Sequence, residues 1–242
     1  MNAQPLPWKL AAHRLLMQGD APHVLTTADL AAFARTAAGD NLPAATLTRW
    51  VRSLAQAGAI EPVIRGVYLN RLAGPSVHPA QAAQYIRRSA IVSLAFVLEQ
   101  CGALNNFGDT VTCVVPLIKG LSAPKVGERS TLASPFRFYA LPQRFFHLQG
   151  VELADVQDLN YQYPRATPER ALLEWVYLGS SAKSRLPLPP LDIALDRLNA
   201  QKLERLAKAM KIEPKWQAWK KAWQQHAQAE DVLENASSGL GF

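Results

Sequence analysis

Three stretches of helical periodicity followed directly by a β-hairpin pattern occupy the first 70 residues, and this order constrains the fold more than any other feature. Apolar residues recur at helical spacing over Trp8–Gln18, Leu30–Ala37 and Leu47–Leu54. Directly afterwards, Ala59–Ile64 and Val67–Asn70 are β-prone and are separated by an Arg–Gly turn signal. Three helices followed by a short hairpin predict a winged helix-turn-helix.

Local signals place the ends of two of these helices. Thr26 and Asp29 have capping-box spacing at the start of the second helix. Pro43 suits the first turn of the third helix, and Gly58 is typical of its end. The third helix is therefore expected between Pro43 and Gly58.

The third helix has two different faces. Its apolar residues are spaced i, i+3, i+4 and i+7: Leu47, Trp50, Val51 and Leu54. The opposite face carries no acidic residue and consists of Ala45, Thr48, Arg49, Arg52, Ser53 and Gln56. Arginine can form a bidentate contact with guanine, glutamine can pair with adenine, and small residues allow close approach to the major groove. For an isolated helix a solvated face is the simpler interpretation, but the position before a hairpin favours DNA contact.

The hairpin offers two further candidates for DNA contact. Arg65 lies at the predicted turn and Tyr68 follows it, and both side chains suit a phosphate or minor-groove contact. The alternative is that Arg65 is an ordinary exposed turn residue and Tyr68 a packing residue. The sequence leaves both interpretations open.

A segment rich in Gly, Pro and Ser, Arg71–Pro79, predicts a domain boundary. We therefore expect a winged helix-turn-helix domain over residues 1–73 and a mixed α/β domain over 76–242, helical from about residue 168. The predicted fold class is α+β.

The second domain has a mixed pattern. Helical segments are expected at 80–87 and 92–101, and β-rich runs follow at 110–115, 136–141 and 145–153. Thr167 and Pro168 open a helix that ends at Gly179, as a capping residue and a first-turn proline should. Further helices are expected at 191–198, 201–211 and 215–233.

Charge and composition limit the class of protein. The 242 residues include 26 Lys and Arg against 19 Asp and Glu, a net charge of +7, and 49% are hydrophobic, as in a globular protein. The surplus is spread along the chain, so charge alone does not decide whether nucleic acid is a partner. The sequence has neither an 18-residue apolar run nor a secretory signal, so we expect a cytoplasmic protein without a membrane partner.

Sequence patterns of common enzymes are missing. No HExxH, CxxC, GxGxxG, P-loop or GxSxG motif occurs, so we expect no catalytic activity, no metal and no cofactor. The only Glu-x-Lys, at residues 213–215, contains a proline that a central nuclease strand would exclude. Cys101 and Cys113 lie in apolar surroundings and are expected to be buried, unreactive thiols.

Three tryptophans share one face of the last predicted helix and are interleaved with lysines. At spacing i, i+3 and i+7 such a stripe is usually part of the core. The alternative is a surface for a partner or nucleic acid, with Trp216, Trp219, Lys220, Lys221 and Trp223 as its candidates.

Three motifs, taken in order, point to a known family. They are Arg65–Tyr68 in the hairpin, Ser93-Leu94 before a helix that ends at Gly102, and the block Ala166–Leu173. Over roughly residues 10–180 the chain resembles the AbiEi antitoxins of type IV toxin–antitoxin systems, which act in phage defence. The resemblance implies an N-terminal domain that represses its own operon at repeated promoter sequences, and a C-terminal domain that opposes a nucleotidyltransferase-like toxin.

The block Ala166–Leu173 could also suggest catalysis, because Glu169 and Arg170 lie at a helix N-terminus. Capping by Thr167 and Pro168 already accounts for the pattern, so we interpret the block as a fold determinant. For the whole chain, the alternative function is a stand-alone winged-helix regulator whose second domain senses a ligand or mediates association.

Overall fold

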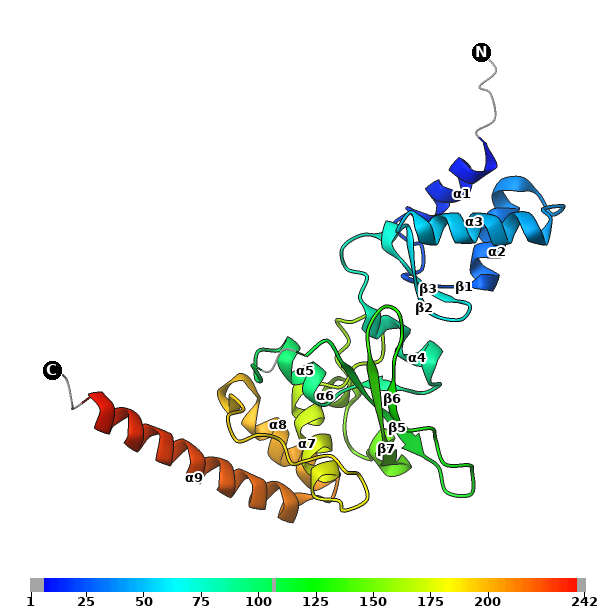
Figure 1. Ribbon diagram of the computed structural model, residues 1–242. Helices are drawn as coiled ribbons and strands as arrows, with labels where there is room; N and C mark the ends of the chain where they lie inside the picture. Colours follow the sequence, from blue (N-terminus) through cyan, green and yellow to red (C-terminus); the bar gives the residue numbers. More distant parts are fainter. Residues whose placement is uncertain (1–6, 106–107, 239–242) are drawn as a thin grey trace. The chain divides into compact units, whose positions relative to one another are not determined.

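The protein has a mixed α/β fold in two compact units, and the computed structural model describes residues 7–105 and 108–238 (Figure 1). The first unit consists of Met1–Arg88 and Ser130–Pro135. The second consists of Ser89–Arg129 and Phe136–Phe242. Among the described residues no helix is both long and apolar enough to span a bilayer.

The three helices expected in the first unit are confirmed as α1 (Trp8–Leu16), α2 (Thr27–Ala38) and α3 (Ala44–Gln56). The capping box of α2 forms as predicted: the Asp29 amide donates to the Thr26 hydroxyl at 3.2 Å, and the Thr26 amide donates to the Asp29 carboxylate at 2.7 Å. Pro43 is the N-cap residue of α3 and not part of its first turn.

A three-stranded antiparallel sheet completes this unit, in the order β1-β3-β2. The predicted hairpin is confirmed as β2 (Ile60–Ile64) and β3 (Val67–Asn70). The first strand, β1 (Val24–Thr26), was not predicted, because three residues are too few to show periodicity. The core between helices and sheet contains Leu16, Leu25, Leu30, Trp50, Leu54 and Ile60.

The fully buried Asn70 joins three parts of the first unit. Its side-chain amide donates to the carbonyls of Leu16, at the end of α1, and Pro22, at 2.9 and 3.2 Å. Its side-chain oxygen accepts from the Leu72 amide at 3.2 Å. Because the Asn70 side chain is fully buried and each partner is a backbone group of another segment, the contacts fix how the chain turns on either side of the sheet.

Asn70→Ala is expected to destabilise the first unit by about 2–3 kcal/mol, since the backbone groups of Leu16, Pro22 and Leu72 lose their hydrogen bonds to a fully buried side chain. Amide hydrogen exchange of α1 and β3 measures the loss locally. Asn160→Ala removes an exposed asparagine and serves as the control. Equal exchange rates in the two variants would contradict a structural role for Asn70.

The predicted boundary at Gly74–Ser76 does not coincide with the division between the units, which falls at Arg88–Ser89. The Arg71 guanidinium donates to Glu61 at 2.7 Å and to the Val77 carbonyl at 2.6 Å. Gln81 lies 2.7 Å from the His23 imidazole. These bonds hold the Gly- and Pro-rich segment, with the short helices η1 (Arg71–Ala73), η2 (Pro79–Ala82) and α4 (Ala83–Ile86), on the first unit.

A second, discontinuous segment also belongs to the first unit. Ser130–Pro135 lies between two strands of the second unit in the chain, yet it packs with the first. The Leu132 amide donates to the carbonyl of Val63, on β2, at 3.4 Å. The segment is shaped by a turn in which the Thr131 hydroxyl donates to the Ser134 carbonyl at 2.6 Å.

The second unit contains a mixed four-stranded sheet in the order β4-β5-β7-β6. Its strands are β4 (Ile91–Val92), β5 (Val111–Leu117), β6 (Gly127–Arg129) and β7 (Phe136–Pro142). β5 and β7 run parallel, and the other two pairs are antiparallel. The sheet confirms the β-rich runs predicted at 110–115 and 136–141.

Two predicted elements near this sheet are wrong. The segment 92–101 is not one helix: it starts in β4 and becomes helical only in α5 (Ala95–Gln100), because Leu94 has a φ of 61° that interrupts it. The β-rich run 145–153 forms no strand: Phe145 is buried in the core from the short helix η3 (Gln143–Phe146), before α6 (Leu153–Val156).

Helices follow from residue 168, as predicted. They are α7 (Pro168–Gly179), α8 (Ala200–Ala209) and α9 (Glu213–Ser238). The helix expected at 191–198 shortens to the single turn η4 (Leu195–Arg197). In Figure 1, α7 lies beside α8, and it also contacts α5 and α9. Nine of the twelve residues of α7 are buried, so α7 is the central helix of the unit.

The block Ala166–Leu173 begins this central helix, as its interpretation as a fold determinant requires. The Thr167 hydroxyl caps α7 by accepting from the Arg170 amide at 3.4 Å, and Pro168 opens the first turn. The Glu169 carboxylate accepts from the Asn199 amide at 3.1 Å and forms an ion pair with Lys202 at 3.1 Å, which ties α7 to the start of α8.

One turn further along α7, a buried ion pair joins α7 to the β4–α5 connection. Arg170 and Glu174 are 2.7 Å apart, and the Ser93 hydroxyl donates to the other oxygen of Glu174 at 2.5 Å. Glu174 and Ser93 are both 0% exposed. The Arg170 guanidinium also donates to the Val156 carbonyl at 3.2 Å. This set of side chains fixes α7 against the sheet.

Candidate nucleic-acid interface

The outer face of α3 is exposed over its whole length. On the inner face, Trp50 and Leu54 are 2% and 3% exposed and lie in the core. The predicted contact residues all lie on the other side and are exposed: Ala45, Thr48, Arg49, Arg52, Ser53 and Gln56. The buried and exposed faces of the helix are therefore those predicted from the amphipathic pattern, and the six candidates lie together on the exposed face.

The polar side chains of this face differ in what they already bind. The hydroxyls of Thr48 and Ser53 donate back to their own helix, to the carbonyls of Ala44 at 2.9 Å and Trp50 at 2.7 Å. The Arg49 Nε donates to the Ala45 carbonyl at 3.3 Å, which leaves its terminal nitrogens available. Within the described residues, Arg52 has no hydrogen bond or ion pair to another side chain.

The first unit has the larger net positive charge, because it contains few acidic residues. It holds nine Lys and Arg against four Asp and Glu, a net charge of +5, whereas the second unit holds 17 against 15, a net charge of +2. Two of the four acids are already engaged, Asp29 in the capping box and Glu61 with Arg71 at 2.5 Å. The unit that carries α3 therefore carries most of the net charge of the chain.

The turn between β2 and β3 holds Arg65 at an exposed tip. Gly66 follows with a φ of 79°, a conformation that favours glycine, and its carbonyl accepts from the Thr27 amide at 3.0 Å. A Cβ at position 66 would lie 3.2 Å from the Thr27 hydroxyl. The turn is thus fixed to the start of α2. Tyr68 is half-buried on the central strand and packs against the core, as the packing interpretation expects.

The tryptophan stripe on α9 is part of the core. Trp216 and Trp219 are 1% and 3% exposed, so a partner cannot reach their rings. The prediction that these two residues could belong to a partner surface is therefore wrong, and both are core residues. Their indole N–H groups donate to Glu204 at 3.0 Å and to the Pro189 carbonyl at 2.9 Å. Trp223 is half-buried and donates to the Ile193 carbonyl at 2.9 Å.

The lysines beside the stripe are closer to the surface. Lys220 lies 2.7 Å from the Glu204 carboxylate, whereas Lys221 is exposed. Because Trp216 and Trp219 are buried, the candidate partner surface on α9 consists of these lysines and the exposed part of Trp223.

Neither cysteine lies in an environment that activates a thiol. Cys113 is fully buried, and burial raises its pKa well above the ordinary value. Cys101 is half-buried, and burial raises its pKa as well. Across residues 7–105 and 108–238, no three His, Cys, Asp or Glu side chains are grouped so that they could hold a metal ion.

Comparisons with known proteins bear on the fold alone. No protein-family model matches the chain, and no curated protein matches it. Among solved structures, the crystal structure of RV2827C protein from Mycobacterium tuberculosis is similar, with a TM-score of 0.51 and 16% identity. The alignment covers 86% of this chain and 73% of that chain. At this identity, what the two proteins share is a fold.

Proposed function

We propose that the first unit is a winged helix-turn-helix that binds double-stranded DNA, with α3 as the recognition helix and the β2–β3 turn as the wing. The observation that carries this proposal is the outer face of α3, which is exposed, free of acid and provided with Arg49, Arg52 and Gln56. A recognition helix needs such a face, because base edges in the major groove are read by bidentate Arg, Asn and Gln contacts.

The arrangement around α3 supports the same function. The helix lies third in a three-helix unit and is followed by a hairpin whose tip presents an exposed Arg65. A net charge of +5 on this unit favours approach to phosphates. In this proposal Arg49 and Arg52 read bases, Arg65 contacts the backbone or minor groove, and Ala45, Thr48 and Ser53 allow close approach.

For the whole chain, we propose an antitoxin that represses its own operon and opposes a nucleotidyltransferase-like toxin through the second unit. The resemblance to the AbiEi family supports this part. Its experiment is co-expression with the adjacent toxin gene in a growth assay, together with a promoter-binding assay. Growth rescue with repression supports the antitoxin. Repression without rescue would instead support a stand-alone regulator whose second unit senses a ligand or mediates association.

DNA binding by this unit is expected to weaken steeply as salt rises, because each phosphate contact releases condensed counterions. The slope of log K against log salt should be about −0.9 for each phosphate contact. A titration of the promoter between about 50 and 200 mM salt measures it. A slope near zero would rule out a phosphate-dominated interface, and Arg65→Ala should reduce the slope by about one unit if the wing contacts a phosphate.

A further inference from the structure

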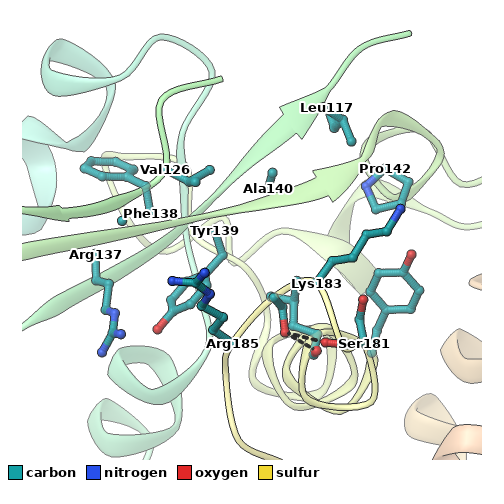
Figure 2. Close-up of a pocket in the computed structure, with 14 residues that line it drawn as sticks. Leu117, Val126, Arg137, Phe138, Tyr139, Ala140, Pro142, Ser181, Lys183 and Arg185 are labelled. Carbon is teal, nitrogen blue, oxygen red and sulfur yellow. Dashed lines mark hydrogen bonds between the residues drawn. The ribbon is translucent and has the colours of Figure 1, made fainter. Parts of the chain in front are cut away.

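We infer that a pocket in the second unit is a binding site for a small aromatic anion, a carboxylate, sulfonate or phosphate on a planar apolar body. The pocket runs along β7 from Arg137, near the start of the strand, to Pro142 at its end, and lies beside the C-terminal end of α7 (Figure 2). This inference goes beyond the DNA-binding proposal and does not depend on it.

The size and lining of the pocket suit a small molecule. Its volume is about 640 Å³, within the range of ligand pockets. Apolar and aromatic groups make up most of the wall: Leu117, Val126, Phe138, Tyr139, Tyr177 and Leu178. Successive side chains of β7 point to opposite faces, and Phe138 is 1% exposed, so an aromatic body would contact the Tyr139 side of the strand.

The charged residues that line the pocket are all positive. Arg137 comes from β7, and Lys183 and Arg185 come from the loop after α7; no Asp or Glu lines the pocket. Among the described residues, none of the three cations forms an ion pair. Glu128 lies opposite Arg137 in the β6–β7 register, outside the lining. In Figure 2, Lys183 extends toward Pro142, while Arg137 and Arg185 lie near Tyr139.

The loop that carries Lys183 and Arg185 is held in place before any ligand binds. The hydroxyls of Ser180 and Ser184 donate to the carbonyls of Val176, at 2.7 Å, and Leu178. The Val176 carbonyl also accepts from the Ser180 amide at 3.0 Å, so the last turn of α7 is closed by hydrogen bonds. The Trp175 indole donates to the Pro187 carbonyl at 2.9 Å, so both ends of the loop are fixed to the helix.

Two backbone features show how tightly this loop is constrained. A Cβ at Gly179 would lie 2.7 Å from both the Leu188 Cα and the Pro187 carbonyl oxygen, so only glycine allows the chain to return this closely. Arg185 has a φ of 52°, which is uncommon for a residue with a side chain. Such conformations gather at ligand-binding sites, where the surroundings hold them. Here the constraint places a cation at the mouth of the pocket.

A fluorescence titration of the full chain with two dyes tests the site. The probes are 8-anilinonaphthalene-1-sulfonate and its neutral counterpart, N-phenyl-1-naphthylamine, which has the same aromatic body without the sulfonate. We expect the anion to bind at least about tenfold more tightly than the neutral dye, because only the anion can pair with the three cations.

Variants then assign the binding to this pocket. The double variant Lys183→Gln/Arg185→Gln changes two exposed loop residues and should weaken the anion at least about tenfold. The matched control Lys208→Gln/Lys221→Gln removes the same charge from exposed positions on α8 and α9, outside the pocket, and should change nothing. Ala140→Phe should block both dyes by filling the pocket.

The inference is overturned if the neutral dye binds as tightly as the anion, or if the loop variant binds the anion like the control variant. Circular dichroism of each variant checks that the fold is intact. We expect both double variants to fold normally, because all four substituted side chains are exposed. Promoter binding is measured separately, so failure of the ligand site and failure of the DNA-binding proposal are distinguishable.

Discussion

Glu174→Ala is expected to destabilise the second unit by about 3–5 kcal/mol, a large part of the 5–15 kcal/mol that holds a typical domain together. The substitution leaves the Arg170 guanidinium, which is 3% exposed, without its carboxylate partner at 2.7 Å. It also removes the acceptor of the Ser93 hydroxyl. A buried charge without a partner costs far more than the contact itself contributes, because water cannot solvate it.

Urea unfolding followed by tryptophan fluorescence measures this loss. Four of the six tryptophans lie in the second unit, so the signal reports mainly on that unit. Arg205→Ala is the matched control: its ion pair with Asp155 involves an arginine that is 60% exposed, and its loss should cost at most about 1 kcal/mol. If the two variants unfold at the same urea concentration, Glu174 does not have the stabilising role described above.

Arg49→Ala and Arg52→Ala are each expected to reduce specific binding to the protein's own promoter, by about 1–3 kcal/mol or roughly 5- to 150-fold in Kd. Both side chains are exposed, so neither variant should unfold the first unit. A titration at fixed salt, with the promoter and with unrelated DNA, separates base reading from phosphate attraction. Base reading predicts a loss confined largely to the promoter.

The control for this pair is Arg14→Ala, an exposed arginine on α1. It removes the same charge from the first unit without touching α3, so it should have a smaller and sequence-independent effect. Unchanged promoter binding in the Arg49 and Arg52 variants together would show that α3 is not the recognition helix.

Elements with strong local signals could be predicted from the sequence, and elements set by distant partners could not. The capping box at Thr26 and the proline at position 168 fix helix starts through bonds within one turn. In contrast, β1 and β6 contain three residues each and exist because β3 and β7 offer them a pairing edge. No periodicity can appear in segments so short.

The candidate sites divide in the same way. The outer face of α3 could be predicted because helical periodicity alone separates exposed from buried positions. On α9, periodicity identified the face that carries the tryptophans. The burial of Trp216, however, depends on α8 and on the chain segment that precedes α8. The pocket could not be predicted from the sequence. Arg137 and Arg185 lie far apart in the chain, and the fold of the second unit brings them to one cavity.

The discontinuous segment Ser130–Pro135 decides how this protein can be divided. Within its sheet β2 is a terminal strand, and an open strand edge invites pairing with another chain. Leu132 covers part of that edge by donating to Val63. A fragment ending at Arg88 would lack this cover, and we expect it to self-associate even though it contains all of α3. No single cleavage of the chain yields both units intact, because Ser130–Pro135 belongs to the first unit but lies within the sequence of the second. The first unit is therefore complete only when the second is attached.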